Sequence, residues 1–254
     1  GMDFGCYGNK NISTPNIDKI AQNGILFKNA FLTAPQSSPS RTSMLSGKFA
    51  HTIGTEDLHN GLNAETLILP TYLHQAGYVT ASMLKTHWGP NGDKQFDVRI
   101  KGDYLPHQGP LSDELFQNYN KFLDENKDNP FFIWVGFIDP HRPYNRNNTE
   151  QRNNPKKIQV PPYLVNSDKT KRDMADYYNE ISRMDDNIGT MMGELDKRGL
   201  TDNTIFVFMS DNGMPFPRCK GSLYDSGIQT PLLFMWKGKI NPGTIHSNGM
   251  VSSI

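Results

Sequence analysis

The chain has 254 residues, enough for one sizeable α/β domain, or two small ones, with a substantial apolar core. Its 26 basic residues balance 26 acidic ones, so the net charge favours neither nucleic acid nor a membrane surface as a general partner. No run of about 18 apolar residues predicts a transmembrane helix, and the N-terminal residues do not form a signal peptide. Cys6 and Cys219 lack metal-site spacing and are expected to be free thiols.

Strands and helices are predicted to alternate along the chain. In the first half, Thr14 is expected to cap a helix that begins at Pro15 and ends at Gly24. The later elements are a strand over 25–32, a helix over 69–75, a strand over 78–83, a helix over 112–126, a buried strand over 131–138, a polar excursion over 144–167, a helix over 170–198, a buried strand over 204–209 and a strand over 231–236.

This alternation predicts the α/β class, with a mostly parallel, mixed sheet sandwiched between helices. In such sheets, ligands bind beyond the carboxyl ends of the strands. Polar clusters at 85–87, 139–142 and 210–213 each follow a predicted strand. We therefore expect these three clusters to meet at one site.

The segment from Ser37 to Gly47 combines hydroxyl groups, a proline and a cation at the start of a predicted helix. Pro39 restricts the backbone, so Ser37 and Ser38 are expected to lie in an extended or turn conformation just before that helix. The N–H groups of a helix start, with Arg41 beside them, favour an anion. The alternative interpretation is an ordinary Ser/Pro loop with a helix cap.

Five other residues carry candidate chemistry. Asp211 and Asn212 offer hard oxygen ligands suited to calcium or magnesium, although Asp-Asn-Gly also fits a simple turn. A lone Lys220 would ordinarily be a solvated surface residue. His87 beside a tryptophan could equally be a packing residue, and His141 could be a loop histidine.

These segments resemble the sulfatase family. The segment from Ser37 to Gly47 matches every fixed position of the family signature, and Ser37 falls on the residue that sulfatases oxidise to formylglycine. The segment 220–227 is similar to the family's Lys-Gly-Thr-x-Tyr-Glu-Gly-Gly. The segment 85–89 is similar to Gly-Lys-Trp-His-x-Gly, with Leu84 in place of the first glycine. The similarity extends over nearly the whole chain.

The resemblance implies an alkaline phosphatase-like fold and a sulfatase mechanism. Ca²⁺, or Mg²⁺, would be bound by Asp211, Asn212 and Ser37. A hydroxyl of the formylglycine hydrate from Ser37, polarised by this cation, would attack sulfur. The other implied roles are neutralisation of the sulfate oxygens by Arg41, Lys85 and Lys220, protonation of the leaving group by His141, and deprotonation of the second hydroxyl by His87.

Within the family, the segments 139–142 and 210–217 are most similar to the heparan N-sulfatase branch, which implies a sulfated amino sugar as substrate and a role in glycosaminoglycan degradation. A serine precursor implies an anaerobic radical-type sulfatase-maturating enzyme as a partner. By analogy, the full-length protein is expected to be periplasmic or exported.

Two family features find no match here: an opening apolar strand that ends in Asp-Asp, and a smaller C-terminal subdomain. We therefore expect residues 1–254 to be a single incomplete catalytic domain, truncated at both ends, with weak metal binding and little turnover. The missing strand should leave an unpaired slot in the sheet that favours self-association.

Two other functions remain open at this stage. One is a phosphate or phosphonate monoester hydrolase of the same superfamily, which also presents a nucleophile to a tetrahedral anion. The other is a non-catalytic fragment that binds sulfated glycan without cleaving it.

Overall fold

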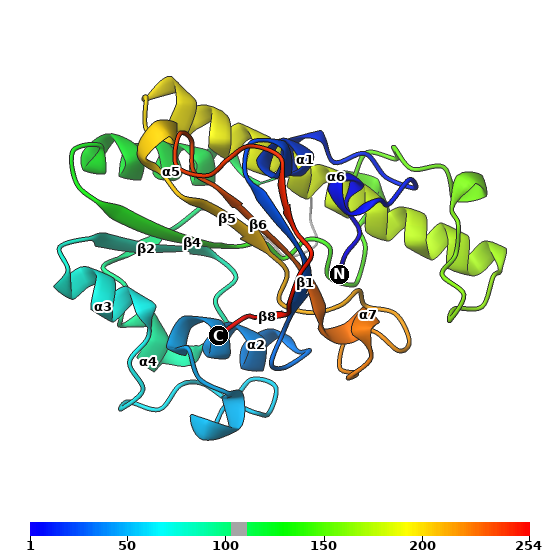
Figure 1. Cartoon of the computed structure of the whole chain (residues 1–254), viewed down its shortest axis with the longest axis horizontal. Coiled ribbons are helices and arrows are strands. Elements are labelled where there is room, and N and C mark those ends of the chain that lie inside the picture. The colour runs from blue at the N-terminus through cyan, green and yellow to red at the C-terminus, as the bar shows by residue number, and fades with distance from the viewer. Residues whose placement is uncertain (103–110) are drawn as a thin grey trace.

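The computed structural model describes residues 1–102 and 111–254, and its described strands form two β-sheets with helices on both sides (Figure 1). The helices α1, α5 and α6 lie on one side, and α2, α3 and α4 lie on the other. The helices are α1 (Pro15–Gln22), α2 (Ser37–Ser46), α3 (Leu69–Gln75), α4 (Gly89–Asp93), α5 (Asp113–Asn126), α6 (Asp168–Lys197) and α7 (Asp225–Ile228). The strands are β1 (Ile25–Phe31), β2 (Val79–Leu84), β3 (Val98–Ile100), β4 (Phe131–Gly136), β5 (Phe206–Met209), β6 (Gln229–Met235), β7 (Thr244–His246) and β8 (Val251–Ser252).

The larger sheet has the order β5-β6-β1-β7, with β8 also beside β1, and the smaller sheet has the order β3-β2-β4. The smaller sheet is parallel throughout, whereas β6 is antiparallel to both β1 and β5. The α/β class, the mixed character of the sheet and the flanking helices are as predicted, and the described strands are divided between one mixed and one parallel sheet. The strand β6 runs backwards because the segment 210–228 contains only the short helix α7, and does not cross back over the sheet as a parallel connection must.

The edge strand β4 of the smaller sheet and the edge strand β5 of the larger sheet border a cavity of about 940 Å³, which is lined by consecutive residues of both strands. We call this cavity the slot. Each of the two strands pairs with one described neighbour, β2 for β4 and β6 for β5. The prediction that both strands are fully buried is therefore wrong: Phe131 to Val135 are only partly buried, and Val207 is 47% exposed.

The helix α6 spans both sheets and supplies much of the core. Its predicted stripe of apolar side chains at steps of three and four residues is buried along its whole length, and consists of Ile181, Met184, Ile188, Met191 and Leu195. The helix begins two residues earlier than predicted because the Ser167 hydroxyl accepts a hydrogen bond from the Thr170 N–H at 3.2 Å. The prediction that the Thr14 side chain caps α1 is wrong. The Thr14 side chain makes no cap bond, and its hydroxyl donates instead to Asp18 at 3.1 Å.

The polar excursion over 144–167 is tied to α6 by side chains along one face of the helix. Asp176 pairs with Arg146, and the side-chain oxygen of Asn179 accepts hydrogen bonds from the N–H groups of Arg152 and Asn153 at 3.0 and 2.9 Å. Glu180 accepts from the Asn145 N–H at 3.1 Å. Because these bonds satisfy the backbone of an irregular segment, the excursion packs onto the domain.

Two of the composition-based expectations can be compared with the structure. Cys6 and Cys219 are both free thiols, as predicted. Among the described residues, no helix is both long and apolar enough to cross a membrane.

The buried carboxyl group of Glu180 makes the stability of the fold depend on pH. Burial and the nearby Asp139 raise the pKa of Glu180 from 4.5 to about 7, and its Oε2 atom has no hydrogen-bond partner among the described residues. The folded state therefore binds this proton more tightly than the unfolded chain does. We expect the stabilisation to be complete below pH 4.5 and to be lost, by at most about 3 kcal/mol, as the pH rises through 7.

The Glu180→Gln substitution, which imitates the protonated acid, should remove this component of the pH dependence. Urea unfolding at pH 5 and pH 8 measures it. The exposed carboxylate of Glu125 on α5 provides a control, and Glu125→Gln should behave as the unsubstituted protein does. Equal loss of stability between the two pH values in the Glu180→Gln and unsubstituted proteins would contradict the assignment.

Candidate active site

Ser37 is the first residue of α2 and lies at the polar end of the slot, with the side chain almost fully buried. The helix starts two residues earlier than predicted, so Ser37 and Ser38 are helical and Gln36 is the extended residue before them. The Ser38 hydroxyl accepts a hydrogen bond from the His59 N–H at 2.8 Å, which fixes the start of the helix. At the other end, Gly47 adopts the left-handed conformation that commonly ends a helix.

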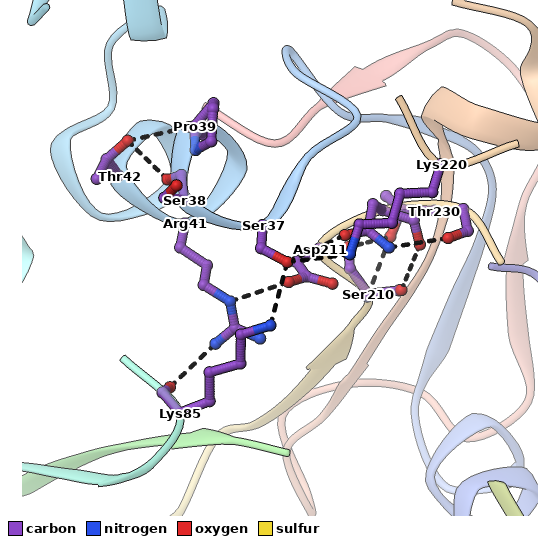
Figure 2. A network of polar contacts seen from close by, with 12 residues as sticks. Ser37, Ser38, Pro39, Arg41, Thr42, Lys85, Ser210, Asp211, Lys220 and Thr230 are labelled. Atoms are coloured by element: carbon purple, nitrogen blue, oxygen red, sulfur yellow. Dashed lines mark hydrogen bonds and ion pairs between the residues drawn. The ribbon is translucent and has the colours of Figure 1, made fainter. Parts of the chain in front are cut away.

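The Ser37 hydroxyl contacts three side chains from other parts of the chain (Figure 2). Lys85, which follows β2, places Nζ 3.1 Å from Ser37 Oγ. Lys220, between β5 and α7, places Nζ at 3.5 Å, and Asn212 Oδ1 lies at 3.4 Å. The carboxyl ends of β2 and β5 thus deliver polar groups to one hydroxyl, as expected from their positions after strands.

Arg41 joins this cluster from the next turn of α2. Its Nε donates to Asp211 Oδ2 at 2.9 Å, and its Nη1 donates to the Lys85 carbonyl at 3.1 Å (Figure 2). The Arg41 side chain is only 6% exposed. One guanidinium group therefore connects the ends of β2 and β5, which belong to different sheets.

The electrostatics of the cluster favour an anion. Burial opposes ionisation of Asp211, but Arg41, Lys85 and Lys220 outweigh it and lower the pKa of this carboxyl group to about 2. Burial, together with Arg41, lowers the pKa of Lys85 to about 8, and the same two causes lower the pKa of Lys220. With three cationic side chains and one carboxylate, the cluster has an excess of positive charge that a bound anion would neutralise.

The two predicted histidines lie around this cluster. His141 lines the same cavity as Ser37, and its Nδ1 lies 2.6 Å from the Arg142 carbonyl. Because a carbonyl oxygen can only accept, this contact places the proton of a neutral ring on Nδ1. His87 makes no hydrogen bond to Ser37 among the described residues. Burial, Lys85 and Arg41 lower its pKa to about 4.

The predicted metal ligands have suitable chemistry but are too few. Asp211, Asn212 and Ser37 provide hard oxygen donors, whereas calcium takes six to eight oxygens. One carboxylate oxygen of Asp211 is already paired with Arg41. No group of three or more His, Cys, Asp or Glu side chains that could bind a metal is found within residues 1–102 and 111–254. The described residues therefore do not complete a calcium site.

Several supporting residues were not predicted. The ring of His59 packs edge-on against that of His87, with centroids 5.4 Å apart. The Thr230 hydroxyl donates to the Ser210 carbonyl at 2.7 Å, and the Ser210 hydroxyl donates to the Asn212 carbonyl at 2.8 Å, which orders the loop that contains Asp211 and Asn212. Isolated polar residues of this kind give no signal in a single sequence.

The fold is the α/β fold of the alkaline phosphatase-like class, and at its site a buried hydroxyl group lies beside cationic side chains from separate elements. A sequence model of the Sulfatase family matches residues 1–254, and the chain belongs to this family.

Individual relatives agree with this assignment. The chain is 32% identical to human N-sulphoglucosamine sulphohydrolase, over 92% of this chain and 52% of that protein. Two solved structures share the fold. One, determined in complex with D-glucosamine-2-N,6-O-disulfate, has a TM-score of 0.75 at 22% identity and covers 99% of this chain and 72% of its own. The other, the phosphonate monoester hydrolase of Agrobacterium radiobacter, has a TM-score of 0.79 at 19% identity and covers 98% and 68%. The chain spans about half the length of the curated relatives it matches.

The small number of oxygen donors predicts weak binding of divalent cations. In calorimetric titration we expect CaCl₂ to bind with a dissociation constant no tighter than about 1 mM, because too few oxygens replace the hydration shell. The Asp211→Asn variant, which removes the only carboxylate of the predicted ligand set, should give a similar trace. Micromolar calcium binding that disappears in this variant would contradict the prediction.

Proposed function

We propose that residues 1–254 form one catalytic domain of a sulfatase, which hydrolyses a sulfate ester or N-sulfate on a sulfated amino sugar. The observation that supports this most directly is the convergence of Arg41, Lys85 and Lys220 on the buried hydroxyl of Ser37. The identity with human N-sulphoglucosamine sulphohydrolase supports an amino sugar as the substrate class, and glycosaminoglycan degradation as the setting.

Sulfatases in general use formylglycine and a divalent metal. We propose that Ser37 is the residue converted here and that Ca²⁺, or Mg²⁺, is the metal in the whole protein. Oxidised Ser37 would supply, as a hydrate, one hydroxyl to attack sulfur and a second to release sulfate. An unmodified serine would be left as a stable sulfate ester, because it has no second hydroxyl.

The three cations would hold the sulfate group during this reaction. Lys85 Nζ and Lys220 Nζ are both within 3.5 Å of Ser37 Oγ, so a sulfate at Ser37 would lie beside both ammonium groups. Arg41 is less free to move, because it is paired with Asp211. Charge that develops on the sulfate oxygens would be stabilised by groups that are already in place, which is where most electrostatic catalysis originates.

The histidines would transfer protons. His141 has its Nδ1 next to the Arg142 carbonyl, and its ring would protonate the leaving group when it is charged. His87, with a pKa of about 4, would be neutral near pH 7 and able to accept a proton from the second hydroxyl. Substrate binding would have to bring His87 and the hydroxyl into contact, since they are not hydrogen-bonded here.

A serine at position 37 also implies a partner and a compartment. We propose that a radical-type sulfatase-maturating enzyme converts Ser37 under anaerobic conditions, and that the whole protein is exported to the periplasm. Both proposals rest on the family resemblance of the segment 37–47.

A paired assay of 4-nitrophenyl sulfate and 4-nitrophenyl phosphate tests the function. We expect slow turnover, because the metal ligands are incomplete, with preference for the sulfate ester. The Lys85→Ala substitution should lower the sulfate rate by about 100-fold, since it removes one preorganised cation. Preference for phosphate would favour a phosphate or phosphonate monoester hydrolase. Binding of sulfated glycan without cleavage would favour a non-catalytic fragment.

Mass spectrometry of the same preparation shows which form of Ser37 was assayed. Trypsin should release the peptide from Asn29 to Arg41, and conversion lowers its mass by about 2 Da through loss of two hydrogens. If Ser37 is unconverted, the peptide should instead gain one SO₃ group after incubation with the sulfate ester. A peptide that changes in neither way, in a preparation that hydrolyses the ester, would contradict the role of Ser37.

We also propose that the slot causes self-association through a strand of a second copy. Both β4 and β5 present edges to this cavity that pair with no described strand, and Val207 on β5 is 47% exposed there. Sedimentation velocity should show association that grows with protein concentration. The Val207→Lys substitution should weaken this association, because the lysine charge would be buried between the two paired strands.

Val98→Lys provides the matched control, because Val98 lies on β3, the outer edge of the smaller sheet. If this control abolishes association and the Val207 variant does not, the copies meet at the outer edge and the slot is not involved.

A further inference from the structure

A second cavity of about 530 Å³ lies beside the slot, and we call this second cavity the basic groove. It is lined by residues from the loop after β4, from the first turns of α6 and from the loop after β5. These residues are Arg142, Arg146, Leu164, Val165, Lys169, Thr170, Arg172, Asp173, Phe216 and Pro217. The volume is within the usual range for small-ligand sites, and no catalytic residue proposed above lines it.

The groove concentrates positive charge in a chain that has none overall. Four of its lining residues are cationic and one is acidic, whereas basic and acidic residues balance over the whole sequence. Arg142 is paired with Asp173, and Arg146 with Asp176 just outside the groove. Lys169 and Arg172 are exposed on the first turns of α6 and have no ion pair within the described part of the chain.

Arg142 is held rigidly at the base of this groove. Its guanidinium group lies over the rings of Tyr144 and Phe216, at 4.7 and 4.8 Å from their centroids. Its Nε donates to the Pro215 carbonyl at 3.0 Å, and two of its nitrogens donate to Asp173. Arg142 is therefore neutralised by Asp173, and the cations of the groove that have no ion pair among the described residues are Lys169 and Arg172 on α6.

At two places, residues adjacent in sequence line the slot and the basic groove. His141 and Pro215 line the slot, while their next neighbours in sequence, Arg142 and Phe216, line the groove. Consecutive Cα atoms are about 3.8 Å apart, so the two cavities are adjacent. A ligand longer than one sugar could occupy both.

We propose that the basic groove binds a second anionic group, a sulfate or a carboxylate, on the sugar next to the one whose sulfate lies at Ser37. This inference rests on the proposed function. Lys169 and Arg172 provide the charge, and Leu164, Val165 and Phe216 provide an apolar wall against which the C–H face of a sugar ring packs. The substrate class is then an oligosaccharide with anionic groups on adjacent sugars, rather than an isolated sulfated monosaccharide.

Isothermal titration with two probes tests the proposal: a heparin tetrasaccharide, and the monosaccharide glucosamine 2-N-sulfate. In the double variant Lys169→Gln/Arg172→Gln we expect the tetrasaccharide to bind about three- to tenfold more weakly, as two exposed ion pairs predict. Monosaccharide binding should change by less than twofold. The loss should diminish at high salt.

Two further variants are the controls. Lys171→Gln removes a cation from the same turn of α6 that does not line the groove, and should leave tetrasaccharide binding unchanged. Lys85→Gln alters the catalytic cluster and should weaken both probes. A carboxyl-reduced tetrasaccharide identifies the anion: if the double variant no longer affects its binding, the groove takes the carboxylate, and if the effect remains, it takes a sulfate.

The outcomes separate the two proposals. If Lys85→Gln weakens binding and the double variant does not, or if Lys171→Gln has the same effect as the double variant, the groove proposal is wrong and the proposed function stands. If the double variant weakens tetrasaccharide binding and Lys85→Gln affects neither probe, the groove binds anions but the proposed function is wrong. If neither has an effect, both are wrong.

Discussion

The structure depends on one buried ion pair, between Arg41 and Asp211, which connects two sheets that share no hydrogen-bonded strand pair among the described strands. Arg41 also donates to the backbone carbonyl of Lys85 at the end of β2. Without Asp211, three cations would be buried around Ser37 without compensation, which is costly in a site of low dielectric. The Asp211 carboxylate is also one of the three proposed metal ligands, so any metal that it bound would share its oxygen atoms with Arg41.

The excess positive charge of the cluster favours the binding of an anion beside Ser37. The positions of Lys85 and Lys220 are set by β2 and by the loop between β5 and α7, so little side-chain ordering is needed when an anion arrives. Burial lowers the pKa of both lysines, which shows that their charges are incompletely solvated. An anion that displaces the remaining water would therefore be bound more strongly than at an exposed pair of lysines.

Much of this arrangement could be predicted from the sequence. The rest could not, because it depends on contacts between distant segments of the chain. The stripe along α6 and the polar clusters after β2, β4 and β5 are local patterns, so the helix and the convergence of Lys85 and Asn212 follow from them. The meeting of Lys220 with Ser37 followed only from the family resemblance. The direction of β6 and the gap between β4 and β5 depend on pairing between distant segments, for which a single sequence gives no signal. The basic groove was missed for the same reason, since it brings together Arg142 from the loop after β4 and Lys169 from the first turn of α6.

The one departure from the family pattern beside Lys85 has a structural explanation. Leu84 has φ +63°, in the left-handed region where the family's glycine has no steric penalty and where another residue costs about 1 kcal/mol. The Leu84 side chain is 4% exposed and packs in the core of the smaller sheet, and burial of a leucine contributes about 2 kcal/mol. Leucine can therefore occupy this position while the backbone keeps its turn. Because the turn is kept, the Lys85 carbonyl still meets Arg41 and the Lys85 ammonium still reaches Ser37.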